Sequence, residues 1–113
     1  MHPIQNQEKL EKELSKRKIS FTKHFEEDTL PARSNVTREM PGKYLRKRFN
    51  HLIAFTHKKD RHENERYNLI FEKSSKYYFL LALSFSNGNI NIITSFVTRK
   101  HRGDPEKLVE RWG

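Results

Sequence analysis

Histidine and arginine side chains recur at three places along the chain, and together they suit the cleavage of RNA without a metal ion. That reaction needs a base that removes the 2′-hydroxyl proton, an acid that protonates the leaving oxygen, and cations that hold the charge developing on the phosphate. Histidine exchanges protons near neutral pH, and an arginine binds two phosphate oxygens at once. The chain therefore carries the side chains needed for metal-independent phosphodiester chemistry.

The three groups lie far apart along the sequence. The first contains His24, Arg33 and Arg38, where an expected strand leads into the loop before a basic helix. The second lies in a charged turn. The third comprises the end of the last expected strand and the residues just beyond it. These two groups comprise His57, Arg61, His62 and Arg66, and then Thr94, Ser95, Thr98, Arg99, Lys100, His101 and Arg102. We expect His24 or His101 to move protons, and most of the six histidines to be exposed side chains without a chemical role.

Other kinds of catalytic site find little support in the sequence. His57 and His62 enclose two acidic residues, but their spacing matches no established zinc signature and the neighbourhood is cationic, so we expect no metal site. The four glycines are far apart, which excludes a phosphate-cradling glycine loop. No nucleophile-elbow pattern occurs either, and we expect no cofactor.

Positive charge is unevenly placed along the chain, whose formal net charge is +9. Residues 29–62 carry nine Lys or Arg against two acids, a net of +7, whereas residues 1–28 carry six of each sign. A surface that only keeps a protein in solution intersperses its signs, while a single-sign field attracts phosphate backbones or acidic partners. We therefore expect a nucleic-acid partner, RNA ahead of DNA. An acidic protein partner and a solvated surface without a binding role remain alternatives.

The cations of the expected helix 41–51 and of the end of the last strand are assigned to the nucleic-acid backbone. Tyr67, beside Arg66, is the aromatic residue best suited to stack on a base, while the phenylalanines and Tyr77 are expected in the core. The expected nucleic-acid-binding residues are Arg38, Lys43, Arg46, Lys47, Arg48, Tyr67, Arg99, Lys100 and Arg102.

Length and composition indicate a single domain over residues 1–113. Apolar residues concentrate between positions 49 and 97, which indicates a local, strand-rich core. The absence of cysteine excludes disulfides and thiolate metal sites. No apolar run approaches the roughly 20 residues that cross a bilayer, and residues 1–18 are polar rather than signal-like. We expect a cytoplasmic protein whose oligomeric state the sequence leaves open.

Hydrophobic periodicity predicts an α+β fold, with N-terminal helices packed on a four- to five-stranded antiparallel sheet and a short C-terminal helix. The expected helices span residues 4–17, 41–51 and 105–112. The expected strands span residues 18–22, 52–56, 66–73, 77–85 and 90–97. The first helix has a narrow apolar stripe and is expected to dock loosely, and Trp112 is expected to pack on the sheet. Segment 77–85 should be central, and Asn87-Gly88 predicts a tight hairpin turn after it.

The order of these elements resembles the RelE/ParE-type toxins and the wider group of metal-independent RNases that includes barnase-like and colicin-like domains. The residues that carry the resemblance are a strand with a trailing histidine, spaced arginines, and a threonine on the final strand. They read Ile19-Ser20-Phe21-Thr22-Lys23-His24, Arg33, Arg38, Glu65-Arg66-Tyr67 and Ile92-Ile93-Thr94. The resemblance covers roughly residues 18–100 and rests on element order and isolated residues.

This resemblance implies RNA cleavage, often at the ribosome, with an acidic antitoxin as the neutralising partner. It makes His24, Arg33, Arg66 and Thr94 active-site candidates, with Tyr67 and Lys100 near them. Two other functions remain open from the residues alone. One is a non-catalytic nucleic-acid-binding regulator of viral or plasmid type that uses the basic helix, and the other is a basic partner of an acidic protein.

Overall fold

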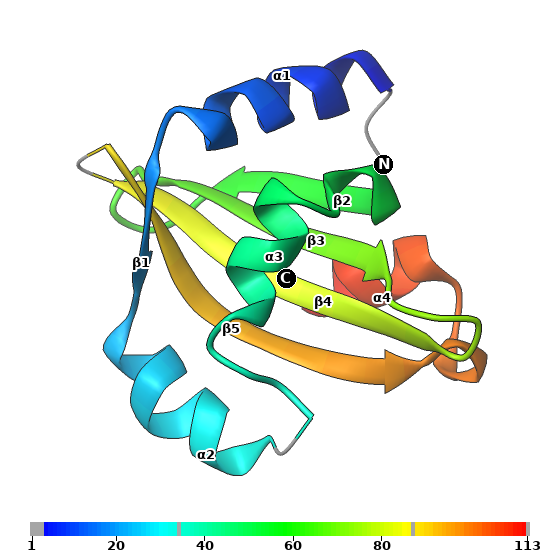
Figure 1. Cartoon of the computed structure of the whole chain (residues 1–113). Coiled ribbons are helices and arrows are strands. Elements are labelled where there is room, and N and C mark those ends of the chain that lie inside the picture. The colour runs from blue at the N-terminus through cyan, green and yellow to red at the C-terminus, as the bar shows by residue number, and fades with distance from the viewer. Residues whose placement is uncertain (1–3, 34, 87, 113) are drawn as a thin grey trace.

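The computed structural model describes residues 4–33, 35–86 and 88–112, and it contains one five-stranded sheet (Figure 1). The strands are β1 (Lys18–Phe21), β2 (Leu52–Lys59), β3 (Glu65–Glu72), β4 (Tyr77–Ser86) and β5 (Asn89–Arg99), in the spatial order β1-β5-β4-β3-β2. The β2-β3, β3-β4 and β4-β5 pairs are antiparallel, while β1 runs parallel to β5. The expected α+β fold is confirmed, and the sheet is antiparallel except at the β1 edge.

Helical elements occupy both ends of the chain and the long connection from β1 to β2. They are α1 (Ile4–Ser15), the π-helical turn η1 (Phe25–Thr29), α2 (Leu30–Ala32), α3 (Met40–Arg46), the 3₁₀ turns η2 (Phe49–His51) and η3 (Lys100–Arg102), and α4 (Pro105–Trp112). The helix expected over residues 41–51 ends early, because Phe49 turns in η2 to meet the Phe71 ring at 6.0 Å and the next residues open β2. No helix in the described ranges is both long and apolar enough to cross a membrane.

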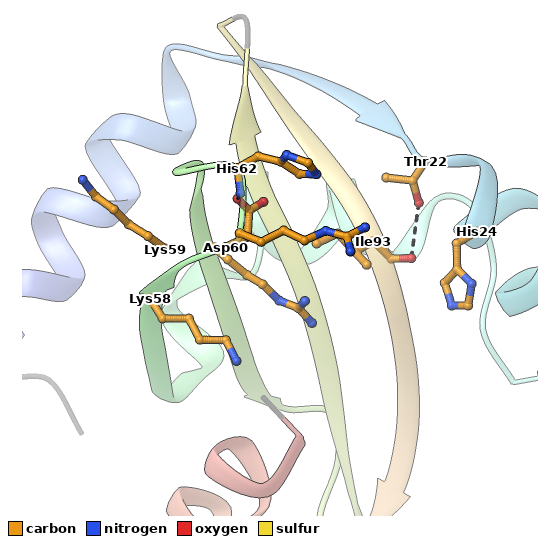
Figure 2. A pocket seen from close by; sticks show the side chains of 9 residues that line it. Thr22, His24, Lys58, Lys59, Asp60, His62 and Ile93 are labelled. Atoms are coloured by element: carbon orange, nitrogen blue, oxygen red, sulfur yellow. Dashed lines mark hydrogen bonds between the residues drawn. The ribbon is translucent and has the colours of Figure 1, made fainter.

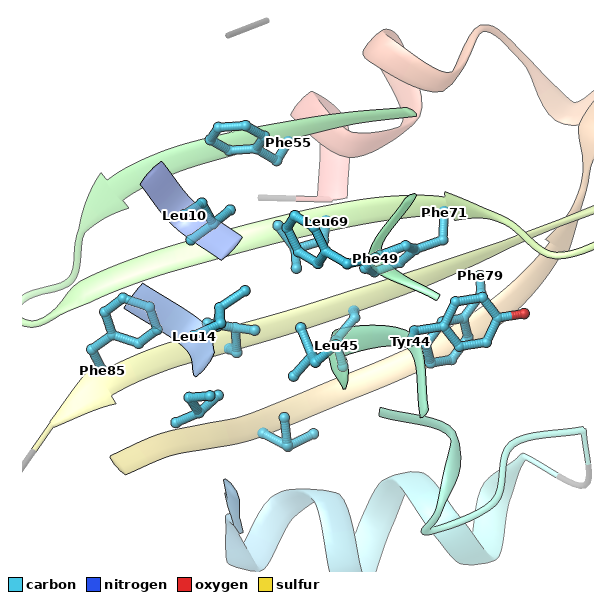
Figure 3. Packing of buried hydrophobic residues seen from close by; sticks show 14 of the residues in the cluster. Leu10, Leu14, Tyr44, Leu45, Phe49, Phe55, Leu69, Phe71, Phe79 and Phe85 are labelled. Atoms are coloured by element: carbon cyan, nitrogen blue, oxygen red, sulfur yellow. The ribbon is translucent and has the colours of Figure 1, made fainter. Parts of the chain in front are cut away.

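The larger core lies between one face of the sheet, here called the covered face, and helices α1 and α3 (Figures 1 and 3). Strand residues alternate between faces, so β4 places Phe79, Leu81 and Leu83 on this side, all fully buried. Helix α1 contributes Leu10 and Leu14, which are buried in the same cluster. Packing of this kind fixes the sheet against the N-terminal half of the chain.

The opposite face, here called the open face, is only partly covered. Helix α4 packs Val109 and Leu108 against Ala54, Ile70 and Leu80 of strands β2 to β4. Figure 1 shows α4 and α3 on opposite sides of the sheet. The side chain of Trp112 lies outside the described residues. Beyond α4, the open face carries polar residues instead of an apolar cluster.

A β-bulge in β5 decides which residues reach the open face. Ile92 pairs with Leu83, and the next pair along the ladder is Thr94 with Ala82, so Ile93 is an extra residue that has no pairing partner in β4. With regular alternation Ile92 and Thr94 would share a face. The extra residue instead leaves Ile92 in the core and turns Thr94 to the open face.

The β4-β5 hairpin agrees with the expected turn. Gly88 has a φ of 76°, a left-handed conformation that glycine adopts without a Cβ penalty. The strands on either side pair from Ser86 and Asn89 onwards. β4 is flanked by β3 and β5, and its residues from Tyr78 to Phe85 are all buried, which confirms its central position.

Candidate nucleic-acid site

A pocket of about 800 Å³ lies on the polar part of the open face (Figure 2). Three segments distant in sequence form it: the end of β1, the turn between β2 and β3, and the bulge of β5. Its lining residues are Thr22, His24, Lys58, Lys59, Asp60, Arg61, His62, Arg66 and Ile93. Six of these nine side chains are cationic or can become so, which suits an anionic ligand.

His24 lies three residues beyond the end of β1, at the start of the π-helical turn η1. Its Nδ1 lies 3.0 Å from Oδ2 of Asp28, one helical turn further on. An interaction at Nδ1 orients the ring and leaves Nε2 as the nitrogen for proton exchange with a ligand.

Two of the three acidic residues that follow His24 have a cationic partner. Glu26 accepts a hydrogen bond from Arg38 at 2.7 Å, and Glu27 lies 4.0 Å from Lys23. These two pairs reduce the negative charge that the three acids present to a phosphate. Arg38 also lies 4.4 Å from the Phe21 ring, so it belongs to this local network and does not line the pocket.

Arg66 places its guanidinium at the pocket and directly opposite Lys58 in the β2-β3 ladder. Two like charges directly across a pair of strands repel each other, and an anion between them relieves that repulsion. The Nε of Arg66 is buried and, within the residues described, has no hydrogen-bond partner. The same is true of Oδ1 of Asn68, two residues further along β3 on the same face. Buried polar atoms of this kind are normally satisfied, by protein, water or a ligand.

The turn opposite His24 is held in shape by Asp60. Its Oδ1 accepts hydrogen bonds from the amides of His62 at 2.8 Å and Asn64 at 3.0 Å. The Asn64 amide, with a smaller contribution from that of His62, holds the pKa of the Asp60 carboxyl below its usual value. Glu63 in the same turn has a φ of 65°, which an L-residue adopts at a cost. The turn thereby places His62 on the pocket wall.

Thr94 and Arg33 lie beside the pocket without lining it. The Thr94 hydroxyl is 2.7 Å from that of Thr29, at the end of η1, so β5 and the segment carrying His24 are tied together. The Arg33 guanidinium lies 5.1 Å from the ring of Phe96, two residues beyond Thr94 on the same face. Of the four residues that the resemblance selects, His24 and Arg66 line the pocket. Thr94 lies on β5 next to the pocket, and Arg33 lies over the Phe96 ring further along β5.

His101 lies in a different place. It lines a second pocket at the far end of β5, together with Arg99 and Lys100. Arg99 lies six residues beyond Ile93 along β5, about 20 Å at about 3.3 Å per residue. The side chain of Arg102 lies outside the described residues. His101 therefore cannot share a reacting phosphate with His24.

Tyr67 lies on the covered face, the opposite side of the sheet from Arg66. Its ring stacks on that of His57 with centroids 4.4 Å apart and also contacts Phe85. Burial raises the pKa of its hydroxyl, and the nearby carboxylates of Glu65 and Glu13 raise it further. The structure does not bring Tyr67 to the pocket.

The cations of α3 also lie on the side of the covered face. Tyr44 and Leu45 face the sheet, so Lys43, Arg46 and Lys47 are exposed on the side of α3 that points away from the sheet. Arg46 donates hydrogen bonds to the carbonyl oxygens of Leu14 and Arg17. Arg48 hydrogen-bonds Tyr44, whose pKa burial raises and this arginine partly lowers again. The positive charge that is continuous in sequence is thus divided between two faces.

Of the nine residues that line the pocket, only His24 and Arg66 were selected from the sequence as catalytic or binding. Arg61 and His62 were named in the charged turn without an assigned role, and the other five, Thr22, Lys58, Lys59, Asp60 and Ile93, were assigned none. The available signal was the Asp60 turn, because an aspartate that accepts amides two and four residues ahead fixes a compact loop. Within the described chain, no group of three or more His, Cys, Asp or Glu side chains is placed to hold a metal ion. No protein-family model, curated protein or solved structure matches this chain.

Proposed function

We propose that the protein is a metal-independent endoribonuclease that cleaves RNA in the open-face pocket. The observation that carries the proposal is the placement of two histidines, His24 and His62, on one pocket that Lys58, Arg61 and Arg66 also line. Two groups that exchange protons near neutral pH and a set of phosphate-binding cations are what this chemistry requires.

In the proposed reaction one histidine, as a base, removes the proton of the ribose 2′-hydroxyl. The 2′-oxygen then forms a bond to phosphorus while the bond from phosphorus to the 5′-oxygen breaks, and the second histidine, as an acid, protonates that oxygen. The products are a 2′,3′-cyclic phosphate and a free 5′-hydroxyl. Arg66 and Lys58 hold the phosphate oxygens, on which charge increases during the reaction.

Asp28 supports His24 in this scheme by fixing its ring through Nδ1. Thr94 acts indirectly: its hydroxyl is hydrogen-bonded to that of Thr29, which holds the η1 segment next to His24 in place. DNA is not a substrate for this chemistry, because it lacks the 2′-hydroxyl that forms the new bond. RNA is therefore the proposed substrate class.

The test is cleavage of a fluorescent RNA oligonucleotide by the purified protein in excess chelator, from pH 5 to pH 8. We expect products ending in a 2′,3′-cyclic phosphate, and no cleavage of the matching DNA. The variants His24→Gln and His62→Gln should each slow cleavage about 10²- to 10⁴-fold. His51→Gln is the matched control, because His51 ends the η2 turn just before β2, outside the pocket, and contacts the Glu72 carbonyl.

Intact RNA at every pH, including with ribosomes present, would refute the nuclease. Binding to uncleaved RNA that weakens as salt rises would then identify a non-catalytic nucleic-acid binder. Capture of an acidic protein after nuclease treatment, without any affinity for RNA, would identify a basic partner of an acidic protein.

A further inference from the structure

We propose that the second pocket, at the far end of β5, is a phosphate-binding subsite for the same RNA strand that enters the open-face pocket. It has a volume of about 350 Å³ and is lined by Ser75, Lys76, Tyr77, Arg99, Lys100 and His101. This inference rests on the proposed function. It adds a second place, distant from the bond that is cleaved, where the protein binds the RNA substrate.

The charge in this second pocket is available to a ligand. Lys100 is paired with Glu72 at 2.9 Å, which neutralises it. Neither Lys76 nor Arg99, by contrast, forms an ion pair with an acid in the part of the chain that the structure describes. Their cationic groups therefore remain for a phosphate.

The pocket also has a defined shape. The Lys100 amide donates to the Lys76 carbonyl at 2.9 Å, so the β3-β4 turn and the end of β5 are bound together. The Arg99 guanidinium lies 5.9 Å from the Tyr77 ring, within the range of a cation–π contact. A mobile tail of basic residues would lack both contacts.

Strand β5 runs from the bulge at Ile93, in the first pocket, to Arg99, in the second (Figure 1). Arg99 pairs with Tyr77 and is two residues from Val97 of the covered-face core, so its side chain lies on the covered side and an RNA strand reaches it around the end of the sheet. The residues between them on the open face are Thr94, Phe96 and Thr98. Phe96 is half-buried with Arg33 beside its ring, an aromatic and guanidinium pair of the type on which bases stack. A cationic site at each end with a stacking surface between them is the arrangement that single-stranded nucleic acid uses.

The separation of about 20 Å, at about 3.3 Å per strand residue, sets a minimum substrate length. A trinucleotide placed at the open-face pocket cannot also fill the second one, whereas a 12-nucleotide strand, within the about 4–16 nucleotides typical of single-strand sites, can. The cations of the second pocket should therefore strengthen binding of the long strand only.

The test compares the wild-type protein with the double variant Lys76→Glu/Arg99→Glu. Binding is measured by fluorescence anisotropy with 2′-O-methyl RNA of 12 and 3 nucleotides, which cannot be cleaved. The variant should bind the 12-mer at least tenfold more weakly and the 3-mer as the wild type does. Because the variant lacks two cations that neutralise phosphates, the slope of log affinity against log salt should become shallower by about 1.4, at about 0.7 per phosphate.

Lys43→Glu/Lys47→Glu is the matched control, since it changes the net charge by the same amount at exposed side chains in and next to α3, outside both pockets. It should retain most of the affinity for the 12-mer. Equal losses of affinity in the two double variants, or no loss at Lys76 and Arg99, would overturn the subsite. If the wild type binds neither strand, the subsite and the nuclease both fail.

Cleavage separates this inference from the proposed function. If RNA is cleaved but the Lys76/Arg99 variant binds the 12-mer normally, only the subsite is overturned. If RNA is not cleaved but the variant loses affinity for the 12-mer alone, the subsite stands and the nuclease proposal falls.

Discussion

The hydroxyl groups of Thr29 and Thr94 lie 2.7 Å apart, although 65 residues separate them in the chain. Thr29 is 2% exposed, so water cannot readily replace this hydrogen bond. The contact joins the end of the π-helical turn η1 to β5 just after its bulge. It therefore fixes the segment that begins at His24 against the strand that passes both pockets.

Replacing one of these threonines with valine should destabilise the fold. Thr94→Val leaves the buried Thr29 hydroxyl without its partner, at a cost of about 1–3 kcal/mol, and Thr29→Val leaves the half-buried Thr94 hydroxyl without its partner, at a smaller cost. The double variant removes both hydroxyls and should be more stable than the two single effects added together. Urea unfolding of the four proteins measures this coupling, with Thr98→Val as a control on the same face of β5. Strictly additive effects would show that the two hydroxyls do not interact.

Asp28→Asn should reduce cleavage modestly. The His24 and Asp28 side chains are 56% and 68% exposed, and an exposed pair of this kind contributes about 0.2–1 kcal/mol. Such a loss corresponds to a rate about 1.4- to 5-fold lower. We expect the change in kcat with KM unchanged, because Asp28 orients His24 rather than holding the RNA.

The conservative variant Asp28→Glu should recover part of the lost rate. A rise in KM with kcat unchanged would instead place Asp28 in substrate binding. Unchanged far-ultraviolet circular dichroism shows that the variants remain folded.

Arg46→Met should reduce stability rather than affinity for RNA. Arg46 donates to the carbonyl oxygens of Leu14 and Arg17, which lie at and just beyond the end of α1. Loss of charged hydrogen bonds of this kind costs about 1.5–3 kcal/mol. Urea unfolding measures the loss, and Lys43→Met, one turn earlier on the exposed side of α3, is the matched control. A weaker affinity for RNA with unchanged stability would place α3 in the binding surface after all.

In an alkaline titration of the folded protein, Tyr44 and Tyr67 should ionise at a higher pH than a tyrosine exposed to water. Burial raises the pKa of both Tyr44 and Tyr67 above the usual value of 10.0. A raised pKa in the folded state means that the stabilising effect is complete below about pH 10, the unfolded value, and is lost as the pH rises through the folded value. Absorbance at 295 nm should show ionisation above pH 10 that weakens in Tyr67→Phe. Ionisation of all four tyrosines at pH 10 in the folded protein would contradict this.

Much of the fold follows from hydrophobic periodicity in the sequence. The apolar segment that forms β4 and the C-terminal helix begin and end close to the expected positions, and Gly88 of the expected turn has a positive φ, because each has a local signal. Asn87 of that turn lies outside the described residues. The bulge at Ile93 has no local signal. Alternation along β5 assigns Ile92 and Thr94 to the same face, and only the pairing with β4 shows that an extra residue separates them.

Only part of the pocket corresponds to residues selected from the sequence. His24 and Arg66 were selected, and both line the pocket. Tyr67 was selected because it adjoins Arg66, yet neighbouring residues of a strand point to opposite faces. Helix α3 is amphipathic and buries Tyr44 and Leu45 against the covered face of the sheet. Its cations lie on the opposite side of the helix and therefore point away from the sheet and its open face. The sequence shows that charge is concentrated but not which side of the sheet receives it.

The parallel pairing of β1 with β5 governs the order in which the molecule can assemble. Lys18 pairs with Asn89 across about 70 intervening residues, and closing a loop of that length costs about 4 kcal/mol in chain entropy by its logarithmic term. Contacts so distant in sequence form late in folding. During synthesis the segment that carries His24 is made long before the strand on which it docks. We therefore expect the nascent chain to have no complete pocket until β5 has been made.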